Sequence, residues 1–129
     1  MFDPKKFLQD IVSKKADEII RGYFASDAII CWHDSNEQLT LEEFIKANRE
    51  YPSVWTCFIE RIEKLQKGFA MVAQLDHPED GFFMKYVSFI ELNDTGLVQR
   101  LDEWFVAIEE IPQWRKDMNI GRPIEKIQA

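Results

Sequence analysis

Residues 82–108, FFMKYVSFIELNDTGLVQRLDEWFVAI, decide the fold of this chain. The side chains alternate in character over Phe82–Leu92 and again over Leu97–Ile108, and this period of two predicts two strands. The break between them, Asn93-Asp94-Thr95-Gly96, has the length and composition of a hairpin loop. Strands joined by so short a loop are antiparallel neighbours, so the stretch predicts a long hairpin.

The residues on either side of this hairpin extend the pattern. Strands are predicted over Val54–Leu65 and Phe69–His77, and glycine and proline mark the short breaks between the four strands. Four successive strands with short breaks predict an antiparallel meander. After the meander, Ile111–Arg115 predicts a turn that packs Trp114.

The N-terminal part of the chain predicts two helices and a strand. Asp3 can cap a helix that carries Pro4 in its first turn. A second short helix is predicted around Ile19–Phe24, where apolar residues cluster. The β-branched apolar run Ala28–His33 then predicts a strand, and the polar residues Asp34–Glu37 predict a turn.

A third helix is predicted between this strand and the meander. Thr40-Leu41-Glu42-Glu43 has the capping-box pattern, so the helix should start at Leu41. It should end near Tyr51, because the residue before a proline avoids the helical conformation. Helices, one strand, a helix and a strand meander predict an α+β domain with the helices on one face of a bent sheet.

The strand Phe82–Leu92 carries apolar side chains on both of its faces. A sheet that is apolar on both sides needs a second cover besides its own helices, and a partner subunit is the simplest one. The sequence therefore predicts a homodimer through the convex face of the sheet. The residues that alternate are Met84, Tyr86 and Ile90 on one face and Phe83, Val87 and Phe89 on the other.

Composition excludes several classes of protein. The 129 residues suit one domain, and 46% hydrophobic with 30% charged residues allow a core and a solvated surface. The net charge of −7 argues against nucleic-acid and polybasic membrane binding, which both need lysine and arginine. Charges interrupt every apolar run before it reaches the length of a membrane span. With two cysteines and no secretory signal, the expected location is the cytoplasm.

Several motifs together resemble a known superfamily. Tyr23-Phe24-Ala25-Ser26-Asp27-Ala28 resembles the helix-to-strand junction of nuclear transport factor 2-like proteins. Over nearly the whole chain, the order of motifs is similar to that of an uncharacterised bacterial branch of SnoaL-like proteins. The motifs are Asn48-Arg49-Glu50-Tyr51-Pro52, Glu60-Arg61-Ile62, Leu101-Asp102-Glu103-Trp104 and Pro112-Gln113-Trp114-Arg115.

The resemblance implies a cone-shaped, cystatin-like α+β fold for a single domain over residues 1–129. Three N-terminal helices would lie on a strongly curved, mostly antiparallel sheet, with a pocket in its concave face and a dimer formed through the sheet. Fold alone does not give function, because relatives include isomerases, dehydratases, hydrolases, cyclases and non-catalytic binding modules.

Ketosteroid isomerase chemistry does not transfer to this chain. An ungapped count from Ala28 places Trp32 where that enzyme has its carboxylate base. The positions of its two oxyanion donors fall on Leu8 and Ser88. Without a base, the proton shuttle of that enzyme is lost.

Limonene-epoxide hydrolase resembles this chain best in the last strand. The final carboxylate of that enzyme corresponds to Glu103, but its partner arginine and aspartate fall near Ala70 and Val72. One acid with no partner to position water argues against a hydrolase.

Glu103 is thus the candidate catalytic residue. The alternative interpretation is that Glu103 is an ionised glutamate at the rim of the cone. If it faces inward among apolar walls, burial should raise its pKa toward neutrality, as a general acid or base near pH 7 requires. Strand parity predicts that hydrogen-bonding side chains face the same way. The predicted ligand pocket comprises Glu103 with Trp32, Trp55, Tyr86, Ser88 and Gln74.

No metal site or cofactor is expected. The only two histidines, His33 and His77, have no Cys or carboxylate at ligand spacing, and His77 stands beside Pro78 in an expected exposed hairpin. Cys31 and Cys57 lie in apolar strand patterns and are expected to be packed thiols.

Three functions remain open at this point. The first is a domain that binds an unknown small apolar ligand in an aromatic-lined pocket. The second is an enzyme of the isomerase, cyclase or hydratase kind on an apolar substrate, with Glu103 as general acid or base. The third is a protein-interaction scaffold, which predicts a filled cone instead of a sizeable pocket.

Overall fold

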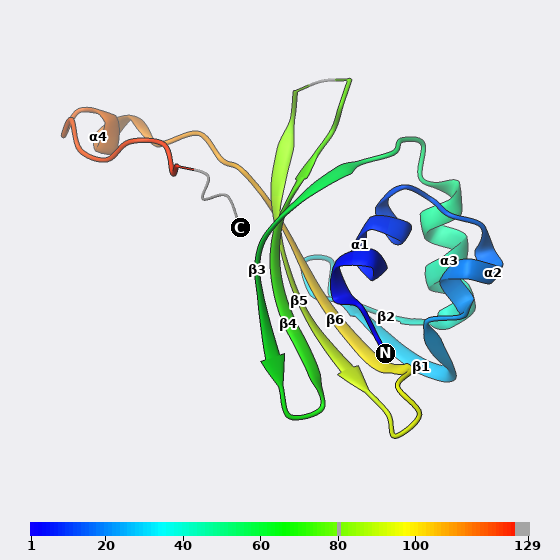
Figure 1. Cartoon of the computed structure of the whole chain (residues 1–129). Helices are drawn as coiled ribbons and strands as arrows, with labels where there is room; N and C mark the ends of the chain where they lie inside the picture. The colour runs from blue at the N-terminus through cyan, green and yellow to red at the C-terminus, as the bar shows by residue number, and fades with distance from the viewer. Residues whose placement is uncertain (80, 126–129) are drawn as a thin grey trace.

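The computed structural model describes residues 1–79 and 81–125, so residue 80 of the predicted turn and the end of the predicted domain lie outside the described residues. Six strands form one curved sheet in the order β2-β1-β6-β5-β4-β3, and α1, α2 and α3 lie on one of its faces (Figure 1). In chain order the elements are α1 (Pro4–Val12), α2 (Asp17–Arg21), β1 (Phe24–Trp32), β2 (Glu37–Thr40), α3 (Leu41–Glu50), β3 (Thr56–Leu65), β4 (Gly68–Asp76), β5 (Phe83–Leu92), β6 (Val98–Ala107) and α4 (Gln113–Lys116).

The predicted meander is confirmed. β3, β4, β5 and β6 pair antiparallel with their sequence neighbours, and their bounds differ from the predicted ones by a few residues at most. Register pairs such as Ser88 with Glu103 therefore place Tyr86, Ser88, Glu103 and Phe105 on one face of the sheet. This inner face is the one that the helices cover (Figure 1).

The first strand begins earlier than predicted. β1 begins at Phe24, so the second helix ends earlier than the apolar cluster suggested. β1 lies between β2 and β6 and runs parallel to β6, with Trp32 beside Glu103. The residues Glu37–Thr40, partly assigned to a turn, instead form the edge strand β2. Three of these four side chains are polar and exposed, which suits an edge strand and explains why the segment lacks a clear strand pattern.

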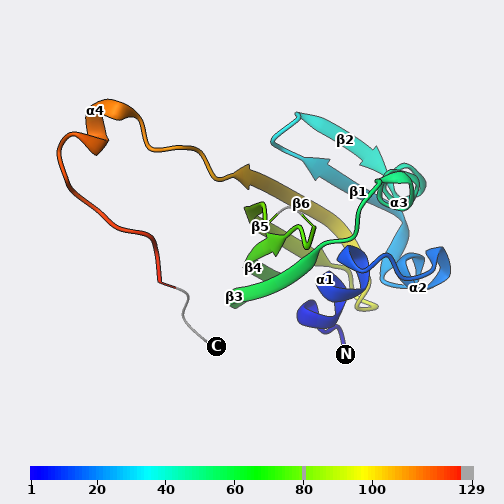
Figure 2. The ribbon, with the colours of Figure 1, turned by 90° about the horizontal axis from the view of Figure 1, so that it is seen from above.

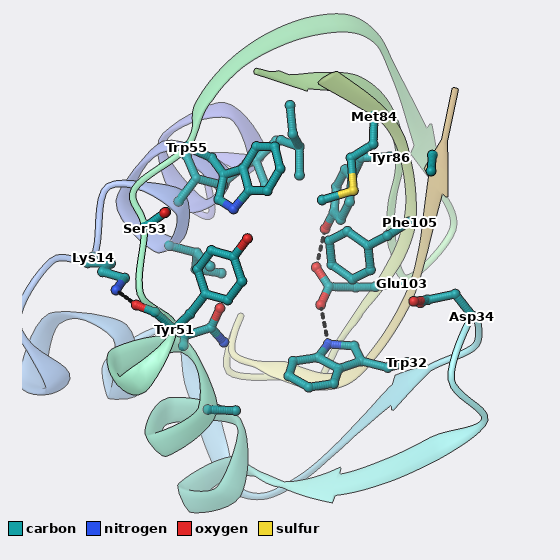
Figure 3. Close-up of a pocket in the computed structure, with 17 residues that line it drawn as sticks. Lys14, Trp32, Asp34, Tyr51, Ser53, Trp55, Met84, Tyr86, Glu103 and Phe105 are labelled. Atoms are coloured by element: carbon teal, nitrogen blue, oxygen red, sulfur yellow. Dashed lines mark hydrogen bonds between the residues drawn. The ribbon is translucent and has the colours of Figure 1, made fainter. Parts of the chain in front are cut away.

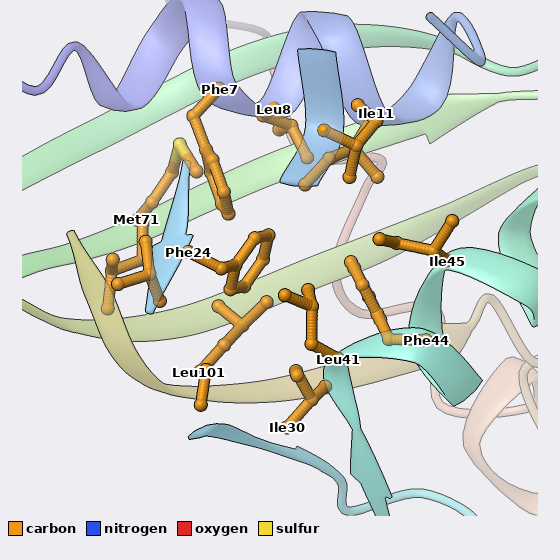
Figure 4. Packing of buried hydrophobic residues seen from close by; sticks show 14 of the residues in the cluster. Phe7, Leu8, Ile11, Phe24, Ile30, Leu41, Phe44, Ile45, Met71 and Leu101 are labelled. Carbon is orange, nitrogen blue, oxygen red and sulfur yellow. The ribbon is translucent and has the colours of Figure 1, made fainter. Parts of the chain in front are cut away.

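Side-chain caps fix both longer helices as predicted. The carboxylate of Asp3 accepts the backbone N–H groups of Lys5 and Lys6 at the start of α1. Thr40 and Glu43 form the full capping box of α3, with hydrogen bonds of 3.2 and 2.9 Å. Each helix then places its apolar stripe on the sheet (Figure 4). The packed side chains include Phe7, Leu8 and Ile11 from α1, Leu41, Phe44 and Ile45 from α3, and Phe24, Ile30, Met71 and Leu101 from the sheet.

Gly68 opens β4 at a point where no side chain fits. Its φ is +158°, and a Cβ atom there would lie 1.7 Å from the backbone carbonyl oxygen of Ile90. We expect Gly68→Ala to lower the free energy of unfolding by about 2–3 kcal/mol or more, because the backbone of β5 must move. Urea denaturation measures this loss. Gly22→Ala is the control: its Cβ would meet other atoms only at 3.4 Å and beyond, so an equal loss there would contradict the steric explanation.

After β6 the chain leaves the sheet on the side opposite α1, α2 and α3 (Figures 1 and 2). The predicted turn forms there as α4, but Trp114 is 65% exposed and does not pack on the domain. Along residues 1–79 and 81–125, no helix has the length and hydropathy needed to span a membrane.

Candidate functional site

A cavity of about 410 Å³ lies between the inner face of the sheet and the helices (Figure 3). β5 and β6 supply its floor through alternate residues, because inward-facing positions on a strand are two apart. Most of the lining is apolar or aromatic. The lining comprises Leu8, Ile11, Val12 and Lys14 near α1, Trp32 and Asp34, Ala47 and Asn48 of α3, Tyr51, Ser53 and Trp55, and Leu75, Met84, Tyr86, Glu103, Phe105 and Ala107 of the sheet.

Glu103 is a buried carboxyl in the wall of this cavity, with 3% of its surface exposed. The indole N–H of Trp32 donates to its Oε1 over 3.0 Å, and the hydroxyl of Tyr86 donates to its Oε2 (Figure 3). The parallel pairing of β1 with β6 brings Trp32 beside it, and the antiparallel pairing of β5 with β6 brings Tyr86. Each carboxylate oxygen therefore has a hydrogen-bond donor that fixes its orientation.

Burial raises the pKa of Glu103 to about 7, because the ionised form loses its hydration. The hydrogen bonds from Tyr86 and Trp32 favour the carboxylate and oppose this rise, while the charge of Asp34 adds to it. The pKa of the Tyr86 hydroxyl is raised well above its ordinary value by burial and by the charge of Glu103, so Tyr86 stays a donor. Near neutral pH this wall of the cavity therefore holds a carboxyl that can both give and take a proton.

The structure brings together four of the six residues predicted for the pocket. Trp32, Trp55, Tyr86 and Glu103 line the cavity. Ser88 faces inward, opposite Glu103, but it is fully buried and does not line the cavity.

Gln74 is a wrong prediction. It pairs with Lys85, one position away from the pair of Ala73 with Tyr86, so its side chain lies on the outer face of the sheet. There its amide donates to Asp76 over 2.8 Å. Strand parity failed because the register across the β4–β5 turn sets which residues share a face.

The mouth of the cavity contains residues that the sequence analysis missed. Lys14 follows α1 with a φ of +57°, and its ammonium group donates to the backbone carbonyls of Arg49 and Tyr51 (Figure 3). Tyr51 is the C-cap of α3, and its ring stacks with that of Trp55 at 6.2 Å between centroids. The proline after Tyr51 was the one available signal, since it forces the chain to turn where the helix ends.

A second polar cluster lies on the outer face. Cys31 and His33 are two positions apart on one side of the β1 end, and Asp102 is the partner of Cys31 on β6. Their ligand atoms lie within 4.8 Å of one another, so the inference that no Cys or carboxylate stands at ligand spacing is wrong. The guanidinium of Arg100, however, donates a hydrogen bond to the Asp102 carboxylate over 3.0 Å and lies 3.5 Å from the sulfur of Cys31. The guanidinium already balances the carboxylate, and we assign no metal to this cluster.

His77 is buried, with 8% of its surface exposed, which corrects its expected exposure in a hairpin. Its backbone N–H donates to the carbonyl of Phe82 over 2.8 Å. Trp55 covers the imidazole edge-on at 5.1 Å between ring centroids. The loop before β3 thus buries a residue that local sequence placed at the surface.

The sequence matches no protein-family model and no curated protein. Solved structures are similar. A proposed ketosteroid isomerase from Kribbella flavida DSM 17836 is 23% identical over 95% of this chain and 89% of its own, with a TM-score of 0.77. An NTF2-like protein of unknown function from Burkholderia xenovorans LB400 is 17% identical over 94% of each chain, with a TM-score of 0.70. A proposed isomerase of the SnoaL-like family from Agrobacterium tumefaciens str. C58 is 12% identical over 78% of this chain and 92% of its own, with a TM-score of 0.57.

Proposed function

We propose that this chain, which has the nuclear transport factor 2-like, cystatin-like fold, binds a small and largely apolar molecule in its cone. The observation that carries the proposal is the cavity itself. Its volume of about 410 Å³ lies within the range of small-molecule pockets, roughly 300–1,000 Å³. A protein-interaction scaffold would fit a filled cone better, so the cavity favours a ligand over that third alternative.

The lining defines the kind of molecule that fits. Leu8, Ile11 and Met84 offer aliphatic contacts, and Trp55 and Phe105 offer flat aromatic ones. Glu103 is the buried carboxyl among the lining residues, so the ligand needs a hydrogen-bonding group that reaches it. An apolar ring system or short chain with a single polar function meets both requirements.

A second candidate function is catalysis by proton transfer. The observation that favours it is the Glu103 carboxyl, whose pKa of about 7 suits a general acid or base at neutral pH. As a base, the carboxylate would take a proton from an apolar substrate and return it at another atom, as an isomerisation requires. Tyr86 and Trp32 would orient the carboxylate through their hydrogen bonds. Two proteins of this fold have been described as proposed isomerases, and this description supports the candidate function.

Thermal denaturation with a compound library tests the binding proposal. Aromatic and terpenoid compounds that carry one polar group are the first choice. Trimethylamine is included because a protein of this fold from Catenulispora acidiphila DSM 44928 was solved with it. A true ligand at 100 times its dissociation constant should stabilise the fold by about 2.7 kcal/mol, which raises the melting temperature by several degrees.

Ala47→Phe is the control for this screen, because Ala47 lines the cavity from α3 and a larger side chain there fills part of it while Glu103 is kept. A compound that stabilises the wild type should lose most of its effect on this variant. Equal shifts in both proteins would place binding outside the cone. A library that stabilises neither would contradict the proposal.

A further inference from the structure

The chain after β6 carries large apolar side chains that its own domain does not cover. We call residues 108–125 the C-terminal arm. The arm has local order, since α4 closes with a hydrogen bond from the Asp117 N–H to the Gln113 carbonyl over 3.0 Å. Its apolar residues are nevertheless 47–82% exposed, and exposed apolar surface of this extent marks an interaction site. These residues are Ile108, Ile111, Trp114, Met118, Ile120 and Ile124.

The outer face of the sheet is a second uncovered apolar surface. Val72, Val87 and Trp104 are register partners across β4, β5 and β6, so they form one row on this face. Phe89 and Val106 flank the row and are 45% and 52% exposed. The ring of Phe89 meets Trp104 edge-on at 5.9 Å between centroids, which makes the surface continuous. We call these five residues the outer patch.

The arm and the outer patch lie on the same side of the molecule. α1, α2 and α3 cover the inner face, while the arm leaves the end of β6 on the other side of the sheet (Figures 1 and 2). Because Phe89, Val106 and Trp114 all stay exposed in the single chain, the arm does not cover the outer patch of its own sheet.

We infer that the arm of each chain packs on the outer patch of a second copy, in a two-fold dimer that exchanges arms. One chain supplies both an uncovered arm and an uncovered patch, so a two-fold axis satisfies both surfaces in a single interface and makes every contact twice. This gives the homodimer expected from the two-sided strand a specific structural basis. A different partner would have to cover two separate surfaces at once.

The area available fits a stable dimer. A large apolar side chain buries roughly 60–120 Å² when it is fully covered, so six that are about half exposed offer on the order of 300–400 Å² per arm. Each arm covers a similar area of the facing sheet. Two arms and two patches then bury on the order of 1,400 Å², within the range of specific interfaces.

Light scattering after size exclusion tests the inference at micromolar concentration. We expect twice the 15.3 kDa mass of the chain for the wild type and a monomer for a variant that ends at Ala107. Trp114→Ala should weaken the dimer about thirty-fold or more, as loss of a buried tryptophan anchor does. Ile19→Ala is the control, because Ile19 is also a large apolar residue that is 47% exposed but lies on α2, away from the arm and the outer patch. This variant should leave the dimer unchanged. Circular dichroism confirms that the shortened chain keeps its fold.

A photo-crosslinking amino acid at position 114 then locates the arm. In a mixture of isotope-labelled and unlabelled chains, we expect adducts between the two kinds of chain at peptides of β4, β5 or β6. A monomeric wild type overturns the inference, and so does a dimer that survives loss of the arm. Adducts confined to one chain, or placed on the helices, overturn it as well.

Discussion

Replacing Glu103 with glutamine is expected to change how the stability of this protein depends on pH. Glutamine keeps the shape and both hydrogen-bond partners within reach but cannot ionise. The pKa of Glu103 rises from an unfolded value near 4.5 to about 7 in the folded state, mainly through burial. This rise means that the folded chain binds more protons than the unfolded chain between these two pH values, so the wild type loses stability as pH increases through that window.

The expected size of this effect is about 3 kcal/mol, because each unit of pKa corresponds to about 1.4 kcal/mol. Relative to the wild type, Glu103→Gln should therefore gain about 3 kcal/mol in its free energy of unfolding between pH 4 and pH 8. Urea denaturation at a series of pH values measures this difference. A difference that stays constant across the window would show that Glu103 titrates in the folded protein as it does in the unfolded chain.

Tyr86→Phe provides an independent check on the same carboxyl. The Tyr86 hydroxyl lowers the pKa of Glu103 by donating a hydrogen bond to the carboxylate. Its loss should raise that pKa further and extend the falling part of the stability curve to higher pH. A shift in the opposite direction would mean that the two side chains do not interact as the structure indicates.

Glu103→Gln is also expected to separate binding from catalysis. If the cone is an active site, this variant should lose about 10²- to 10⁴-fold in turnover, the usual contribution of a positioned acid or base. Ligand affinity should change little, since the cavity walls remain. Steady-state kinetics and thermal shifts on the compound found by screening provide the two readouts.

Asp102→Asn is the matched control for this experiment. Asp102 directly precedes Glu103 on β6, but its side chain faces outward toward Arg100. Its loss should therefore leave turnover within a few-fold of the wild type. Full turnover after Glu103→Gln would remove Glu103 as the catalytic residue. If the wild type binds its ligand and turns over none of the molecules that fit, the binding function alone remains.

The order of local structures could be predicted from sequence because each depends on neighbouring residues. Asp3 and Thr40 cap helices through side chains that reach only three residues ahead, so their effect is visible in a short window. The hairpin around Asn93–Gly96 likewise depends on a loop and its two flanking strands. Together with the resemblance of its motifs, these signals were enough to predict a cone with helices on a curved sheet.

The sequence also singled out Glu103 and the aromatic residues Trp32, Trp55 and Tyr86, all of which line the cavity. Glu103 was placed by its match to the final carboxylate of limonene-epoxide hydrolase, and Trp32 and Tyr86 by the strand register that this match implies. The error with Gln74 has a clear physical cause: a shift of one residue in register moves a side chain to the other face of a sheet. Register across a turn depends on the pairing of whole strands, which no local pattern contains.

Only the tertiary structure decided the contacts between distant segments. The parallel pairing of β1 with β6 brings Trp32 to Glu103 across 71 positions, and it also gathers Cys31, His33 and Asp102 on the outer face. Contacts between distant segments also bury His77 under Trp55, bring Lys14 to the carbonyls of Arg49 and Tyr51, and leave the C-terminal arm exposed. The sequence alone determined the helix caps and the four strands of the meander, because those features depend on neighbouring residues. The electrostatics of Glu103 and the uncovered surfaces depend on which segments meet, and that is decided by the packing of the whole chain.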